Sequence, residues 1–123
     1  MTKQELKQFT LDLLQAWQNR DAEKIATMYH KDVIAHMDNH SVGYNDIMNR
    51  MEFSKRSFKE VINDLHDLII DDEKVVARIE QTCVGESKTD AYKIIAIYHI
   101  KEYKLVEMWS SFYPNVNYLD NEG

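Results

Sequence analysis

A short stretch of the sequence, His36-x-Asp38-x-His40, combines side chains that are able to bind a metal ion. On an extended segment all three would lie on one face, because successive residues of a strand point to opposite sides. Two imidazoles and a carboxylate suit a divalent transition metal. The ligands of such sites usually come from separate strands, so the spacing favours a polar strand end that leads into a turn. We therefore predict no bound metal ion and no cofactor.

Glu80 is the best candidate for acid–base chemistry, together with His66 or His36. A buried carboxyl group beside an imidazole holds its proton more tightly and is able to exchange it with a substrate. This role requires Glu80 to face the interior of the protein. The alternative is an ion pair with a surface cation such as Arg78, since alternate residues of this stretch resemble a solvated strand face. The sequence favours this alternative and leaves open whether the protein is an enzyme.

Cys83 is the only cysteine, so no disulfide can form within the chain and a reducing compartment is natural. A catalytic thiol needs a base that stabilises its thiolate, and no Cys/His pattern of that kind is present. We expect Cys83 to be a small core residue. With three glycines, the chain also lacks a glycine-rich phosphate-binding loop.

The composition is that of a soluble globular protein, with 44% hydrophobic and 29% charged residues among 123. Its length predicts a single domain. The formal net charge of −6 argues against binding to nucleic acid or to anionic membrane surfaces. No apolar stretch is long enough to span a membrane, and the first residues lack the apolar core of a signal peptide. We therefore expect a cytoplasmic protein.

Helices are expected first and strands afterwards, an order typical of α+β folds. The spacing Thr2-x-x-Glu5 predicts a capping box at the start of the first helix, and Asp21 is suited to cap a second, short one. Imperfect alternation within residues 58–70 predicts a β-bulge between Asn63 and Asp67. The expected elements are helices over residues 3–18, 22–29 and 45–53, strands over 32–37, 58–70 and 75–83, and a β-hairpin over 91–113.

The hairpin is the expected centre of the sheet. Its first strand carries apolar residues on both faces, since Ile94 and Ala96 alternate with Ile95 and Ile97. A strand that is apolar on both faces belongs in the middle of a sheet that is covered on both sides.

Five short stretches stand out by their order and spacing. They are Trp17-(x3)-Asp21, Tyr29-His30-x-Asp32-Val33-x-x-His36, Gly43-x-x-x-Ile47, Asp72-Glu73-Lys74-Val75-Val76-x-Arg78 and Lys104-Leu105-Val106-Glu107-x-Trp109. Together they resemble the SnoaL-like group of the nuclear transport factor 2-like superfamily. The resemblance runs from about Phe9 to Tyr113, which is most of the chain.

The resemblance implies an α+β fold in which a curved antiparallel sheet forms a cone around three N-terminal helices, the cystatin-like or nuclear transport factor 2-like barrel. It also implies a pocket between helices and sheet, and often a homodimer through the outer face of the sheet. We expect one domain over residues 1–123, with residues 119–123 as a frayed tail. The fold leaves function open, since this scaffold hosts isomerases, dehydratases, cyclases, epoxide hydrolases and binding domains.

The resemblance also implies that the ionisable residues of catalytic relatives are missing here. Relatives that resemble ketosteroid isomerase place a base near the end of the first strand, which matches Met37. Their second acidic residue falls near Ala96. Relatives similar to limonene epoxide hydrolase use an Arg-x-Asp pair and a later Asp, which fall near Ile79, Gln81 and Ser110.

The orientation of the middle strand determines whether ionisable side chains point into the pocket. From Val75 to Cys83 apolar residues alternate with polar ones, so Ile79 and Glu80 point to opposite faces. The resemblance places Ile79 inside. A shift of one residue in the alignment would reverse the faces and bring Glu80 into the pocket.

We predict that the protein binds a small hydrophobic molecule in a pocket of large side chains with a few polar groups. The residues expected to line this pocket are Trp17, Tyr29, Met37, Ile79, Gln81, Tyr98, Met108, Ser110 and Phe112.

Two alternatives remain open. The first is a lyase, isomerase or hydrolase that acts on a small hydrophobic substrate through Glu80 with His66 or His36. The second is a non-catalytic dimerisation or partner-binding module, in which Trp109 and Tyr113 form an aromatic patch on one face of the last strand.

Overall fold

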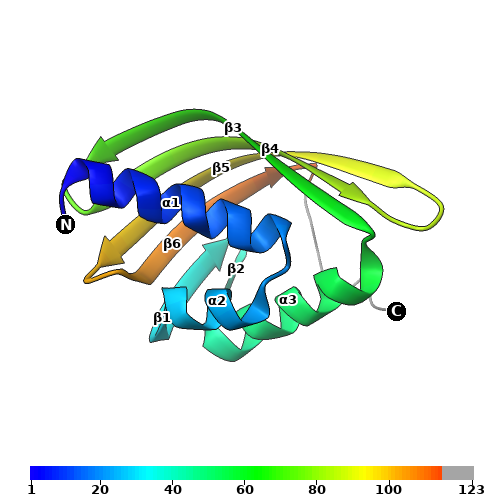
Figure 1. Ribbon diagram of the computed structural model, residues 1–123, viewed down its shortest axis with the longest axis horizontal. Coiled ribbons are helices and arrows are strands. Elements are labelled where there is room, and N and C mark those ends of the chain that lie inside the picture. The colour runs from blue at the N-terminus through cyan, green and yellow to red at the C-terminus, as the bar shows by residue number, and fades with distance from the viewer. Residues whose placement is uncertain (115–123) are drawn as a thin grey trace.

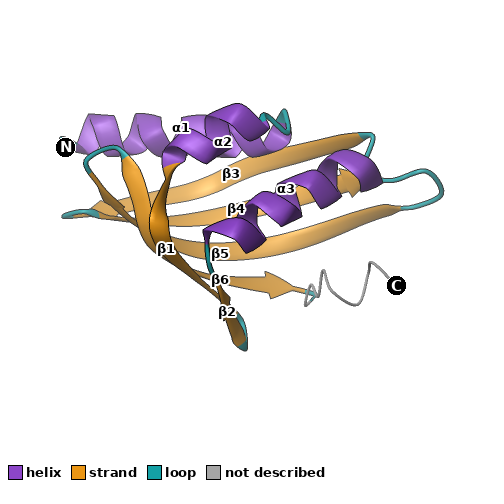
Figure 2. Ribbon diagram, turned by 90° about the horizontal axis from the view of Figure 1, so that it is seen from below, coloured by secondary structure: helices purple, strands orange, loops and turns teal. Residues whose placement is uncertain are grey.

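The structure, a computed structural model, describes residues 1–114 of the chain. Three helices lie against one face of a curved, open six-stranded sheet, which confirms the predicted α+β fold (Figure 1, Figure 2). The predicted tail, residues 119–123, lies outside the described residues. In chain order the elements are α1 (Lys3–Gln18), α2 (Ala22–Met28), β1 (Tyr29–Met37), β2 (His40–Val42), α3 (Tyr44–Ser57), β3 (Glu60–Asp71), β4 (Lys74–Val84), β5 (Thr89–Lys101) and β6 (Lys104–Tyr113).

Both predicted helix caps are present. At the start of α1 the Thr2 hydroxyl accepts a hydrogen bond from the Glu5 amide at 3.1 Å, and the Glu5 carboxylate accepts one from the Thr2 amide at 2.7 Å. The Asp21 carboxylate accepts a hydrogen bond from the Lys24 amide at 3.2 Å and caps α2. These bonds satisfy amides that have no partner within their helix, and so they fix where each helix begins.

The strand order is β2-β1-β6-β5-β4-β3, with β3 to β6 in an antiparallel meander. The expectation of an entirely antiparallel sheet is wrong in one place, because β1 runs parallel to β6. Strand β2 was not among the expected elements, but His40 pairs with Met37 across a tight turn. Alternation of apolar residues is the same in parallel and antiparallel strands, so it does not reveal the direction of β1.

The faces of β4 are the predicted ones. Ile79 is 2% exposed on the concave face, which the helices cover, while Glu80 points to the outer face with half of its side chain exposed. The predicted bulge in β3 is also confirmed. Leu65 pairs with Ile79 and Asp67 with Arg78, so one extra residue on β3 stands between two consecutive pairs.

The outer face of the sheet is not covered within the described residues, and this corrects one expectation. β5 does lie between β4 and β6, and its inward residues, such as Ala96, are buried. Its outward residue Ile95, however, is 48% exposed. Ile34 and Ile69 are exposed outward apolar residues on other strands. An apolar pattern on both faces predicts a strand that is covered on both sides, but none of residues 1–114 covers the outer face of β5.

The core lies between the helices and the concave face. Leu13 of α1, Ile25 of α2 and Met51 of α3 are each at most 1% exposed and belong to one core cluster with inward residues of the sheet. Among the described helices, none has the length and apolar character needed to cross a membrane. The buried residues of the three helices and the inward residues of the sheet form one apolar core.

Candidate functional site

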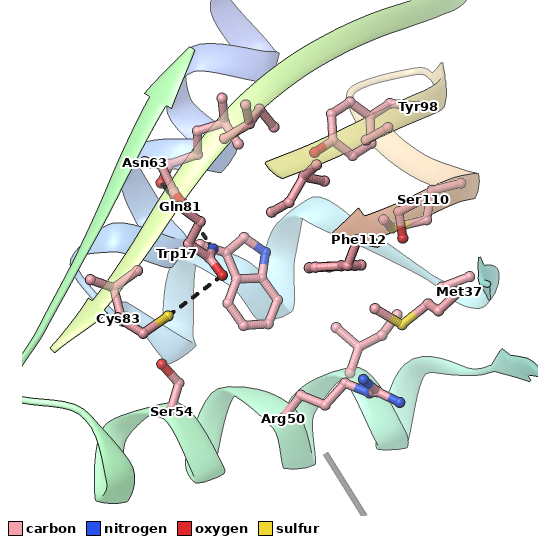
Figure 3. A pocket seen from close by; sticks show the side chains of 18 of the residues that line it. Trp17, Met37, Arg50, Ser54, Asn63, Gln81, Cys83, Tyr98, Ser110 and Phe112 are labelled. Atoms are coloured by element: carbon pink, nitrogen blue, oxygen red, sulfur yellow. Dashed lines mark hydrogen bonds between the residues drawn. The ribbon is translucent and has the colours of Figure 1, made fainter. Parts of the chain in front are cut away.

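A cavity of about 120 Å³ lies between the three helices and the concave face of the sheet. The wall is mostly aliphatic and aromatic (Figure 3). All nine side chains expected to line a pocket lie along this cavity, although their contact with a ligand stays a prediction. They are Trp17, Tyr29, Met37, Ile79, Gln81, Tyr98, Met108, Ser110 and Phe112.

Two aromatic residues from opposite layers meet at the cavity. The indole nitrogen of Trp17, at the end of α1, donates a hydrogen bond to the hydroxyl oxygen of Tyr29, at the start of β1, at 3.0 Å. Burial raises the pKa of Tyr29 and, by the same cause, that of Tyr98 on β5. Both phenols are therefore neutral at physiological pH.

A chain of amide hydrogen bonds closes the cavity on the side of α1. The Gln81 amide nitrogen donates to the Asn63 side-chain oxygen at 2.9 Å, and the Asn63 amide nitrogen donates to the Leu14 carbonyl oxygen at 3.1 Å. The Cys83 thiol donates to the Gln81 side-chain oxygen at 3.6 Å, the bond drawn in Figure 3. Because both ends of the Gln81 amide are engaged, this residue serves mainly to join β4 to β3 and, through Asn63, to α1.

Helix α3 contributes two polar wall residues that the sequence analysis missed. Arg50 and Ser54, one turn apart, line the cavity from α3 (Figure 3). The spacing Ile47, Arg50, Ser54 was the available signal, since residues three and four apart share a helix face. Arg50 is the only charged residue along the described part of the wall, and its guanidinium lies 3.3 Å from the Nε2 atom of His40.

The sequence model of the SnoaL-like domain matches residues 11–108 of the chain. The protein belongs to the SnoaL-like family. This confirms the resemblance that the sequence motifs indicated. A comparison with curated protein sequences gives no match.

Solved structures with the same fold include several bacterial proteins. AclR of Streptomyces galilaeus, a candidate hydroxylase, superposes with a TM-score of 0.80 at 18% identity over 90% of each chain. An LEH-like epoxide hydrolase of M. tuberculosis gives a TM-score of 0.80 at 11% identity, over 89% of this chain and 83% of the other. A candidate SnoaL-like polyketide cyclase of Shewanella putrefaciens gives 0.79 at 14% identity, over 90% and 82%. Identities this low show a common fold alone.

The acid–base candidates of this SnoaL-like domain lie outside its cavity. Glu80 Oε1 is 3.6 Å from His66 Nε2 on the outer face, and the two side chains are 50% and 38% exposed. His36 also points outward, where its Nε2 lies 2.7 Å from a Glu107 oxygen and its ring stacks on Trp109. The condition for acid–base work in the pocket, a buried Glu80, is therefore not met.

The three potential metal ligands of the SnoaL-like domain do not converge. His36 contacts Glu107 and Ser41, while His40 lies beside Arg50. Asp38 occupies the turn between β1 and β2 with a positive φ of 52°. Within residues 1–114 no three His, Cys, Asp or Glu side chains are arranged to hold a metal ion.

Cys83 of the SnoaL-like domain is expected to be a poorly reactive thiol. Burial, with a smaller contribution from the Asp90 carboxylate, raises its pKa to about 11. At pH 8 iodoacetamide should therefore alkylate the folded protein roughly 100-fold more slowly than the chain unfolded in urea, because only the thiolate reacts. Mass spectrometry of timed samples measures both rates. Equal rates would mean that the Cys83 thiol is exposed and ionises normally.

Proposed function

We propose that the protein binds a small, mostly apolar molecule in the cavity between its helices and its sheet. The supporting observation is a cavity of about 120 Å³ whose wall is apolar apart from a few hydroxyl and amide groups and Arg50. A cavity of roughly 150 Å³ admits a benzene molecule. The proposed ligand is thus a one-ring compound, or a larger molecule that places one ring inside.

Proton transfer between a carboxylate and an imidazole does not form part of this proposal. Within residues 1–114 no Asp, Glu or His side chain lines the cavity, and Met37, Ala96 and Ser110 stand where a resemblance to catalytic relatives would place ionisable groups. The wall is suited to enclose an apolar molecule, to exclude water from it and to fix its orientation.

A ligand screen tests the proposal. Indane and similar one- or two-ring hydrocarbons should raise the melting temperature by about 5 °C at roughly ten times their dissociation constants, because they bind the folded state alone. Isothermal titration calorimetry then measures stoichiometry and affinity. If no compound of this size stabilises the protein, the cavity is not a binding site and the proposal falls.

We also propose a homodimer formed through the outer face of the sheet. A row of cross-strand neighbours runs over this face from β3 to β1, and large exposed apolar residues flank it. Apart from His36, whose ring stacks on Trp109, the row is apolar, and exposed apolar surface is typical of association sites. The members of the row are Ile69, Val76, Ile97, Trp109 and His36.

Ile95→Glu is expected to separate this dimer. Ile95 lies beside the row, and its cross-strand neighbour Arg78 makes a carboxylate tolerable in the monomer. Light scattering at about 10 µM should give twice the 14.6 kDa chain mass for the wild type and the chain mass for the variant. Thr82→Glu, on the same face of β4 but away from the row, is the matched control and should stay dimeric. A monomeric wild type would refute the dimer.

The cytoplasm is the proposed location. It is supported by Cys83, a single buried cysteine with no partner cysteine in the sequence, which suits a reducing compartment.

A further inference from the structure

Two hydroxyl groups in the cavity wall have no hydrogen-bond partner among residues 1–114. The Ser110 hydroxyl is inaccessible from outside, in a residue that is 6% exposed, and no partner lies within hydrogen-bond distance. Tyr98 is 5% exposed, and its hydroxyl makes no hydrogen bond to the described residues. Burial, with a smaller contribution from the neighbouring Tyr29, raises its pKa. Both residues line the cavity (Figure 3).

The two hydroxyls come from adjacent strands and the same face. Tyr98 of β5 pairs with Met108 of β6, and Ser110 is the next inward residue along β6. The two residues are thus diagonal neighbours, with α-carbon atoms roughly 7 to 8 Å apart. This spacing allows one bound molecule to contact the Ser110 hydroxyl and the long Tyr98 side chain together.

A buried hydroxyl without a partner weakens folding, because it has given up its bonds to water. The protein accepts this cost at Ser110, which faces the cavity that the proposed ligand would fill, and its diagonal neighbour Tyr98 lines the same cavity. Apart from the Tyr29 phenol, the wall around them is apolar, with Ala96 beside Ser110 and Met108 beside Tyr98. An apolar ligand with one polar atom complements this arrangement better than a pure hydrocarbon does.

The polar atom should be a hydrogen-bond acceptor. Burial raises the pKa of Tyr98, so its hydroxyl keeps its proton and donates. A serine hydroxyl also donates, and a carbonyl oxygen has two lone pairs that are able to accept both bonds. No charged side chain of the described wall belongs to β5 or β6, so a neutral acceptor suits this place.

We propose that the cavity selects molecules that carry a carbonyl oxygen, which accepts hydrogen bonds from the hydroxyls of Ser110 and Tyr98. The inference rests on the proposed function, since it names the class of ligand for the same cavity. Each neutral hydrogen bond contributes about two- to tenfold in affinity.

The test compares 1-indanone with indane, which differ by one carbonyl oxygen. In calorimetric titrations the wild type should bind 1-indanone at least tenfold more tightly. Ser110→Ala and Tyr98→Phe should each reduce that preference by about three- to tenfold and leave the affinity for indane within twofold. Ser111→Ala, which removes an exposed hydroxyl from the outer face of the same strand, is the matched control and should keep the full preference.

The ligand-free variants give an independent measurement. Because Ser110→Ala and Tyr98→Phe remove hydroxyls that lack a partner, neither should lower the melting temperature, and Ser110→Ala should raise it by about 3 °C. A fall of more than about 3 °C in Ser110→Ala would mean that the hydroxyl stabilises the fold, and it would overturn the inference.

The titrations separate this inference from the proposed function. Equal affinities of the wild type for 1-indanone and indane, or tighter binding of 1-indanol than of 1-indanone, would overturn the carbonyl preference and leave the cavity as a binding site. If Ser110→Ala or Tyr98→Phe weakened the binding of 1-indanone and of indane equally, this result would also overturn the carbonyl preference. Binding of neither compound would remove both proposals.

Discussion

Ile79→Asp is expected to lower the free energy of unfolding by about 4 kcal/mol or more at pH 8. Ile79 is 2% exposed and packs in the sheet between Leu65 of β3 and Ile94 of β5. The substitution removes a buried aliphatic side chain and sets a carboxylate against an apolar wall. In the described part of the cavity the only oppositely charged group belongs to Arg50 on α3.

The loss of stability in Ile79→Asp should depend on pH, and the buried environment of the new carboxyl group sets the direction of this dependence. Burial raises the pKa of a carboxyl group in the folded state above its unfolded value of about 3.9. Between these two values the folded protein holds a proton that the unfolded chain has released, so stability falls as the pH rises. Urea unfolding followed by circular dichroism should show a smaller loss for Ile79→Asp at pH 5 than at pH 8.

Glu80→Ala is the matched control on the next residue. The Glu80 side chain is half exposed and lies 3.6 Å from a half-exposed His66, so its removal should change the free energy of unfolding by no more than about 0.5 kcal/mol. The opposite pattern, a tolerated Ile79→Asp and a costly Glu80→Ala, would show that the two faces of β4 are reversed.

The same alternation explains why β4 could be predicted in detail. Side chains of a strand have a period of two, so the apolar set from Val75 to Cys83 identifies the buried face without knowledge of the partners. β3 could not be assigned in this way, because one extra residue at His66 shifts the alternation. The direction of β1 and the existence of β2 depend on pairing between distant residues, which a local pattern does not contain.

The cavity wall could be predicted where it belongs to the sheet and less well where it belongs to α3. Residues such as Met108 and Ser110 follow from strand alternation together with the family resemblance. Arg50 and Ser54 were missed because the angle at which α3 lies on the sheet decides which side of its apolar stripe reaches the cavity. Exposed Ile95 shows a further limit, since an apolar pattern predicts burial without saying which surface covers it.

Ala96→Phe is expected to reduce the affinity for indane at least 100-fold, by filling the space that a ligand would occupy. Ala96 is 1% exposed, and its cross-strand neighbours are Ala77 and Ser110. Ala96 and Ser110, two small side chains that face each other on β5 and β6, both line the cavity. A phenyl ring resembles the benzene molecule that occupies a cavity of roughly 150 Å³, so it should take up most of the 120 Å³ present here.

The variant should still fold, because a ring that enters an existing void costs less than one forced into a packed core, and overpacking costs about 1 to 3 kcal/mol. Calorimetric titration of Ala96→Phe measures the loss of binding, and circular dichroism checks the fold. Lys93→Phe adds the same ring on the outer face of the same strand and should bind indane as the wild type does. Ala96→Leu fills less of the void and should show an intermediate affinity. If Ala96→Phe folds and binds indane unchanged, the ligand occupies another surface, because a filled cavity has no room for it.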